Sequence, residues 1–130
     1  MRRGAGIVAA AALLAACADN SKPGIVKNIP PTDYRDDIGL LLTRTLGDPT
    51  NIRNASISDP MRNGDGPYFV CLRYTARDSP KTYMAPSTQI AYFFDGRLNQ
   101  LIDATPEQCA KAVYKPYPEL EKLCQAKKCE

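Results

Sequence analysis

The amino-acid sequence predicts an α+β fold: a small antiparallel sheet of about four strands, one amino-terminal helix and two short carboxy-terminal helices, stapled by disulfides. Three observations lead to this prediction. A stretch with helical periodicity comes first, extended segments separated by turn residues follow it, and two segments with helix-start signals come last. Helices that precede and follow a run of strands, rather than alternating with them, are typical of a sheet with helices packed on it.

The amino-terminal helix is expected to begin at Thr32, which is a suitable N-cap. Acidic residues lie near the positive end of the helix dipole, at Asp33, Asp36 and Asp37. The residues that recur at helical spacing are Tyr34, Ile38, Leu41, Leu42 and Thr45. Gly47 and Pro49 are expected to end the helix.

Four extended segments are expected next, at 52–58, 68–77, 88–94 and 97–103. The clearest of them is 68–77, in which one apolar row alternates with a second row that begins apolar and ends basic: Phe69, Cys71, Arg73 and Thr75. Residues 59–67 are rich in turn formers and predict a loop. Asp95-Gly96 predicts a two-residue type I′ hairpin between the last two strands.

Two helices are expected at the carboxy-terminal end. Thr105 as N-cap, Pro106 at the first helical position and Gln108 at the capping-box position predict a short helix toward Val113. A second helix starts after Pro116 and Pro118 and carries Leu120, Leu123 and Cys124.

Length and composition limit the class of protein. A chain of 130 residues, 44% hydrophobic and 24% charged, is expected to form one globular domain at most, once a targeting segment is removed. Removing Arg2 and Arg3 from the 17 basic residues leaves 15 against 14 acidic ones. Because no concentrated basic face follows from this balance, we expect no nucleic-acid partner.

The first residues predict a secretory signal peptide. Arg2 and Arg3 precede an apolar stretch from 7 to 16, and small residues lead into Cys17. The apolar run is too short to cross a bilayer, which takes about 20 residues.

The segment Leu14-Ala15-Ala16-Cys17 resembles the lipobox of bacterial lipoproteins. The resemblance implies cleavage between Ala16 and Cys17, a diacylglycerol thioether on Cys17, and a fatty acyl group such as palmitate on the new amino terminus. Several acyl chains anchor a protein stably, whereas one chain does not. Ala18 rather than aspartate follows, which in this family implies transfer to the outer membrane. The alternative is an ordinary signal peptide followed by a chance cysteine.

The expected organisation therefore has three parts. Residues 1–16 are a removed signal peptide, 17–31 a lipidated cysteine with a flexible tether, and 32–130 a single α+β domain. We expect the protein to bind the membrane through the acyl chains on Cys17, so that membrane lipid is one of its partners.

Four cysteines follow the lipobox: Cys71, Cys109, Cys124 and Cys129. In an exported domain an even set predicts two disulfides. We favour Cys71 with Cys109, which leaves Cys124 with Cys129, and an alternative joins Cys109 to Cys124. No C-x-x-C pair is present, so neither a zinc site nor a redox site is expected.

The sequence indicates no catalytic residue, metal or cofactor. Histidine is absent, which removes the usual general base and metal ligand. The polar residues of the 59–67 loop, Asp59, Asn63 and Asp65, do not match a calcium loop. The carboxylate pairs Asp36/Asp37 and Glu119/Glu121 are explained by stabilisation of helix ends.

Two groups of residues suggest binding surfaces. Arg73, Arg77 and Arg97 are a possible basic strip for a carboxylate or lipid phosphate, with a solvated sheet face as the plainer interpretation. Tyr114 and Tyr117 flank the proline-interrupted turn and either present an interaction patch or pack into the core.

The body resembles small envelope lipoproteins of Gram-negative bacteria, through GDPTNIRNASIS at 47–58, YFVCLRYTAR at 68–77 and YPELEKLC at 117–124. The resemblance implies a location in the cell envelope and assigns no activity. We expect a non-catalytic, membrane-tethered binding or structural module that faces the periplasm and has an envelope-protein partner. The alternatives are a small periplasmic enzyme that uses carboxylates or tyrosines, and a module that captures a small ligand between sheet and helix.

Overall fold

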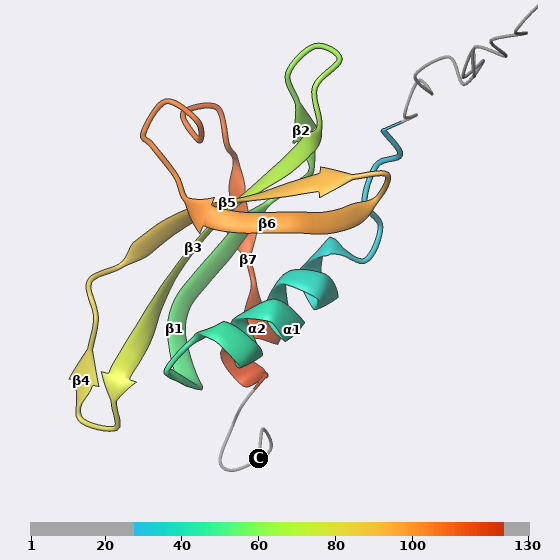
Figure 1. Ribbon diagram of the computed structural model, residues 1–130. Coiled ribbons are helices and arrows are strands. Elements are labelled where there is room, and N and C mark those ends of the chain that lie inside the picture. Colours follow the sequence, from blue (N-terminus) through green and yellow to red (C-terminus); the bar gives the residue numbers. More distant parts are fainter. Residues whose placement is uncertain (1–27, 124–130) are drawn as a thin grey trace, which may run out of the picture.

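The computed structural model describes residues 28–123, and it has an antiparallel sheet with two helices (Figure 1). The lipobox with Ala16 and Cys17, and the expected disulfide partners Cys124 and Cys129, lie outside the described residues. The elements in chain order are α1 (Tyr34–Thr45), β1 (Asp48–Ser58), β2 (Met61–Arg62), β3 (Tyr68–Ser79), β4 (Thr82–Tyr83), β5 (Ser87–Phe94), β6 (Arg97–Asp103), β7 (Tyr114–Pro116) and α2 (Pro118–Lys122). The α+β class is confirmed.

The described sheet has seven strands, so the prediction of about four was too low. The additional strands β2, β4 and β7 are two or three residues long. Such a short segment shows no period of two in the sequence, and its strand geometry comes from pairing with a longer neighbour. Here β2 and β4 pair with β3, and β7 pairs with β1.

The helix predicted from Thr105 toward Val113 is a series of turns instead. The backbone N–H groups of Gln108 and Ala112 donate to carbonyls three residues earlier, at 3.2 and 3.1 Å. So short a segment cannot sustain a helix alone, because helix nucleation is costly. Among the described residues, the carboxy-terminal region therefore contains one helix, α2, instead of the two that were expected.

The main strand order is β6-β5-β3-β1-β7, with every pair antiparallel. The predicted hairpin between β5 and β6 is present, and Asp95 and Gly96 have φ of 52° and 75°. A type I′ turn requires positive φ at both central residues, which an Asp-Gly pair tolerates.

The two faces of β3 pack differently, as its alternation predicts. Val70, Leu72 and Tyr74 join the main core, which also holds Ile38 and Leu42 of α1 and Leu120 of α2. Phe69 and Cys71 face the other way into a smaller core with Ile90 and Cys109. In Figure 1 both helices lie on one side of the twisted sheet, whereas the orange loop after β6 extends away from them.

Helix α1 buries one side, with Ile38 and Leu42 0% and 1% exposed and Leu40 52% exposed. Its N-cap is Asp33 rather than the expected Thr32, and the Asp33 side chain makes no capping hydrogen bond. Tyr117, just before α2, is buried and donates its hydroxyl proton to the Arg35 carbonyl. This contact ties the two helices together.

Strand β1 is bent by two irregularities in its pairing with β3. Asn51 and Asn54 both have φ of 53°, in the left-handed region that asparagine adopts more readily than most residues. The strand's outer edge pairs with β7 at residues 56–58, and beside that pairing the Ala55 N–H donates to Glu121 Oε1 of α2 at 2.9 Å. A covered edge is protected from pairing with another chain.

The first described residues lie against the body. Asn28 Nδ2 donates to the Gly66 carbonyl at 3.1 Å, and Pro31 is buried.

Candidate functional site

A cavity of about 410 Å³ lies beside the Cys71–Cys109 disulfide. Arg73 of β3, Thr88 of β5 and Tyr114 of β7 line it from the sheet. The loop of residues 104–113 supplies the rest of the wall, including Thr105, Pro106 and Ala110. The cavity thus forms where the loop after β6 packs on the sheet face opposite the helices.

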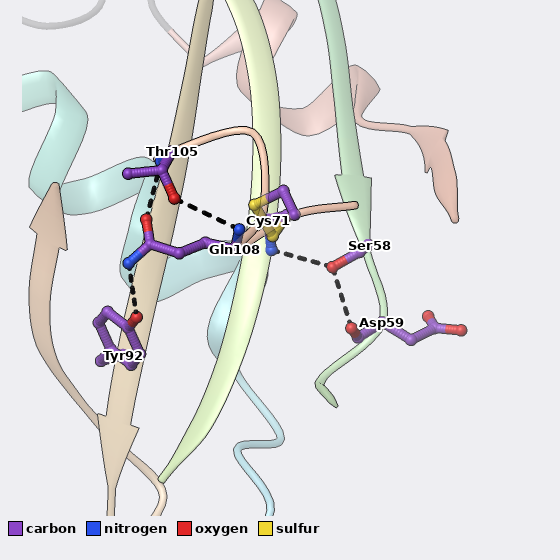
Figure 2. The surroundings of a disulfide bond; sticks show 7 residues. Ser58, Asp59, Cys71, Tyr92, Thr105 and Gln108 are labelled. Carbon is purple, nitrogen blue, oxygen red and sulfur yellow. Dashed lines mark hydrogen bonds between the residues drawn. A yellow bond between two sulfur atoms is a disulfide. The ribbon is translucent and has the colours of Figure 1, made fainter. Parts of the chain in front are cut away.

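The disulfide joins β3 to the loop, across 38 residues of chain and a Cα–Cα distance of 6.0 Å (Figure 2). It is the pairing that the sequence favours. The loop is also fixed through its predicted capping box, although no helix follows. The Thr105 N–H donates to Gln108 Oε1 at 2.8 Å, and the Gln108 N–H donates to Thr105 Oγ1 at 3.4 Å.

Two further hydrogen bonds attach the loop to β5. Gln108 Nε2 donates to the Tyr92 hydroxyl at 3.2 Å, as Figure 2 shows, and the Ala104 N–H donates to the Thr88 carbonyl at 3.0 Å. Together with the disulfide they hold this loop at several points along its length, so the cavity wall is preorganised.

Ser58 of β1 supports the disulfide from the neighbouring strand. It is 1% exposed, and its Oγ accepts the Cys71 N–H at 2.9 Å and donates to the Asp59 carbonyl at 3.0 Å (Figure 2). A buried hydroxyl needs such partners. Sequence reasoning missed Ser58, because a serine within a strand carries no signal of what lies opposite it.

Arg73 and Tyr114 meet above β1. The Arg73 guanidinium carbon lies 4.0 Å from the centre of the Tyr114 ring. On the intervening strand β1, Arg73 is paired with Ser56 and Tyr114 with Ser58. Both residues on this face of β1 are small, so the long arginine side chain can cross the strand to the ring.

Neither polar group of this pair has a hydrogen-bond partner within residues 28–123, although the Arg73 side chain belongs to an exposed residue. The Arg73 guanidinium takes part in no hydrogen bond or ion pair there. The Tyr114 hydroxyl is buried and likewise has no hydrogen-bond partner. Stacking on an aromatic ring holds an arginine by cation–π attraction and leaves its in-plane N–H donors free.

A second, more open basin of about 360 Å³ lies near β4 and α2. Arg53 stacks at 3.9 Å from the centre of the Tyr83 ring, and Arg77 is 5.8 Å from the same centre. Arg77 Nε is 3.8 Å from Asp48 Oδ2. Hydrogen bonds from the Thr50 hydroxyl and N–H lower the pKa of Asp48, and Arg77 adds to this effect.

A third cleft, of about 290 Å³, separates α1 from α2 and is mainly apolar. At its rim Arg35 Nε donates to Glu119 Oε2 at 2.6 Å. Glu119 and Glu121 are therefore both engaged, the first with Arg35 and the second with the β1 backbone.

The structure separates the residues of the proposed basic strip. Arg73 lines the disulfide cavity and Arg77 the second basin, whereas Arg97 lines a cleft beside α1 with Asp37 and Arg44. Of the two tyrosines near the proline turn, Tyr117 is a core residue, 1% exposed, and Tyr114 is half-buried.

Among the described residues, no group of three or more potential metal ligands is present, and no helix has the length and apolar character needed to cross a bilayer. The chain matches no protein-family model, no curated protein and no solved structure.

Proposed function

We propose that the protein is a lipid-anchored, non-catalytic binding module of the bacterial cell envelope, facing the periplasm, and that its ligand site is the cavity beside the Cys71–Cys109 disulfide. The observation that carries the proposal is a preorganised cavity that holds an arginine without an acidic partner. A buried disulfide suits an exported domain, which folds in an oxidising compartment. The lipobox resemblance supports the anchor.

The composition of the cavity favours binding over catalysis. Acid–base chemistry needs a proton donor and acceptor that lie within reach of one substrate. Arg73 is the one charged side chain among the lining residues, and an arginine side chain in a protein stays protonated, so it cannot serve as a general base. The carboxylates at the helix cleft are held by Arg35 and the β1 backbone, at another face of the molecule.

The binding test uses nuclear magnetic resonance of the isotope-labelled full-length protein with a mixed library of small polar fragments. Fragments that occupy the cavity should shift the amide signals of residues 104–113. Ala110→Phe places a bulky ring at the cavity wall and should abolish these shifts, because Ala110 is an exposed lining residue. Ala85→Phe is the matched control, since Ala85 is an exposed alanine that does not line the cavity.

The proposal fails if no fragment shifts the loop signals, or if Ala110→Phe binds as the unchanged protein does. Denaturation curves of both variants establish that they are folded.

A further inference from the structure

We propose that the cavity beside the disulfide binds a small monocarboxylate, whose carboxylate group is held by the guanidinium of Arg73. This inference rests on the proposed function, and it names the chemical class of the ligand.

The three other clefts described above that an arginine lines each have an acidic lining residue as well. Arg35 pairs with Glu119 at 2.6 Å, and Arg77 lies 3.8 Å from Asp48. Arg73 has no such neighbour among the described residues, and no acidic side chain lines its cavity. Arg73 is itself an exposed residue, so its attraction for an anion is strengthened only on the side that faces the cavity wall, where the nearby protein lowers the local dielectric constant.

The guanidinium is also oriented in advance. It lies 4.0 Å from the centre of the Tyr114 ring, and Tyr114 is anchored by the pairing of β7 with β1. Stacking restricts the rotamers of a long side chain, so less conformational entropy is lost on binding. The parallel N–H donors of a guanidinium match the two oxygens of a carboxylate.

Two features select a monocarboxylate. Only one positive charge lines the cavity, which balances a single negative charge and leaves a doubly charged phosphate incompletely neutralised. The other lining residues include four with small apolar side chains, Ala104, Pro106, Ala110 and Ala112, and two threonines, Thr88 and Thr105. A volume of about 410 Å³ lies near the lower end of the range for small-molecule sites, about 300–1,000 Å³.

The experiment compares three probes by isothermal titration of the purified full-length protein: butanoate, its neutral isostere butanamide, and inorganic phosphate. Butanoate should bind saturably, at least about tenfold more tightly than either of the others, because a charge-assisted bidentate hydrogen bond is lost in the amide. Nuclear magnetic resonance should place the butanoate-induced shifts in residues 104–113.

Four variants identify the anchor. Arg73→Gln should weaken butanoate binding by at least about tenfold, and Arg73→Lys should restore only part of the loss, because lysine keeps the charge without the planar fork. Arg97→Gln is the matched control and should bind butanoate normally, since Arg97 lines a different cleft. Tyr114→Leu should also weaken binding, because it removes the ring on which Arg73 stacks.

The outcomes separate this inference from the proposed function. If fragments bind in an Ala110-dependent manner but butanamide or phosphate equals butanoate, or Arg73→Gln binds butanoate normally, the carboxylate assignment is wrong and the binding function stands. If nothing perturbs residues 104–113, both are wrong.

Discussion

At the scale of single residues, the tyrosines show how one side-chain type takes different roles in one sheet. Tyr74 is 2% exposed, and its hydroxyl donates to Gln89 Oε1 at 2.7 Å. Tyr114 has a buried hydroxyl without a partner in residues 28–123. Removing a satisfied hydroxyl loses a hydrogen bond, whereas removing an unsatisfied one relieves a desolvation penalty.

Tyr74→Phe and Tyr114→Phe should therefore change the free energy of unfolding in opposite directions at neutral pH. We expect Tyr74→Phe to destabilise the protein by about 1 kcal/mol, and Tyr114→Phe to be neutral or stabilising by up to about 1 kcal/mol. Urea unfolding of the two variants beside the unchanged protein measures both. A loss of 1 kcal/mol or more in Tyr114→Phe would show that the hydroxyl has a partner.

Tyr74 also gives stability a dependence on alkaline pH. Burial, with a smaller contribution from the Asp103 carboxylate, raises the pKa of Tyr74 from 10.0 to about 12. The neutral phenol is thus favoured in the folded state, and its contribution is complete below pH 10 and lost as pH rises toward about 12. Between these pH values the free energy of unfolding should fall less steeply with pH in Tyr74→Phe than in the unchanged protein. An equal fall in both proteins would show that Tyr74 does not cause this dependence on pH. Burial raises the pKa of Tyr117 as well.

At the scale of elements, the loop of residues 104–113 depends on the sheet for its conformation. Its own hydrogen bonds are single turns and one capping box, and its attachments to the sheet are the disulfide and the contacts with β5. Such a segment is expected to open locally before the core does.

Loss of the disulfide should therefore destabilise the whole domain and release this loop in particular. For a closed loop of 38 residues, the chain-entropy model gives about 4 kcal/mol, a large part of the stability of a small domain. We expect the Cys71→Ala/Cys109→Ala double variant to unfold at much lower urea concentration. Under native conditions, its Gln108 amide should exchange with solvent faster than amides of β3. Unchanged exchange at Gln108 would show that the remaining hydrogen bonds hold the loop by themselves.

An element was predicted correctly where a few neighbouring residues carry the whole sequence signal for it. The β5–β6 hairpin needs only Asp95 and Gly96 at its turn, and both have the required positive φ. The capping box at Thr105 and Gln108 is also formed, yet no helix follows it. Capping hydrogen bonds alone do not supply the tertiary packing that stabilises a short helix.

At the scale of the whole molecule, the proposed lipid anchor makes a prediction independent of the fold. Cys17→Ala should abolish incorporation of labelled palmitate and move the protein from the membrane fraction to the soluble fraction, because the thioether-forming thiol is removed. Cys124→Ala is the control, since it changes a cysteine outside the lipobox. Labelling that persists in Cys17→Ala would refute the lipobox assignment.

The sequence by itself determined the α+β class, the buried side of α1 and the two faces of β3, whereas it favoured the pairing of Cys71 with Cys109 without excluding that of Cys109 with Cys124. These follow from periodicity and residue counts, which are properties of neighbouring positions. Only the tertiary structure decided that β7 pairs with β1 and that the serines of β1 leave Arg73 a path to Tyr114. Arg73 and Tyr114 are 41 positions apart in the chain. Their contact depends on strand register across a third strand, and no local pattern encodes that register.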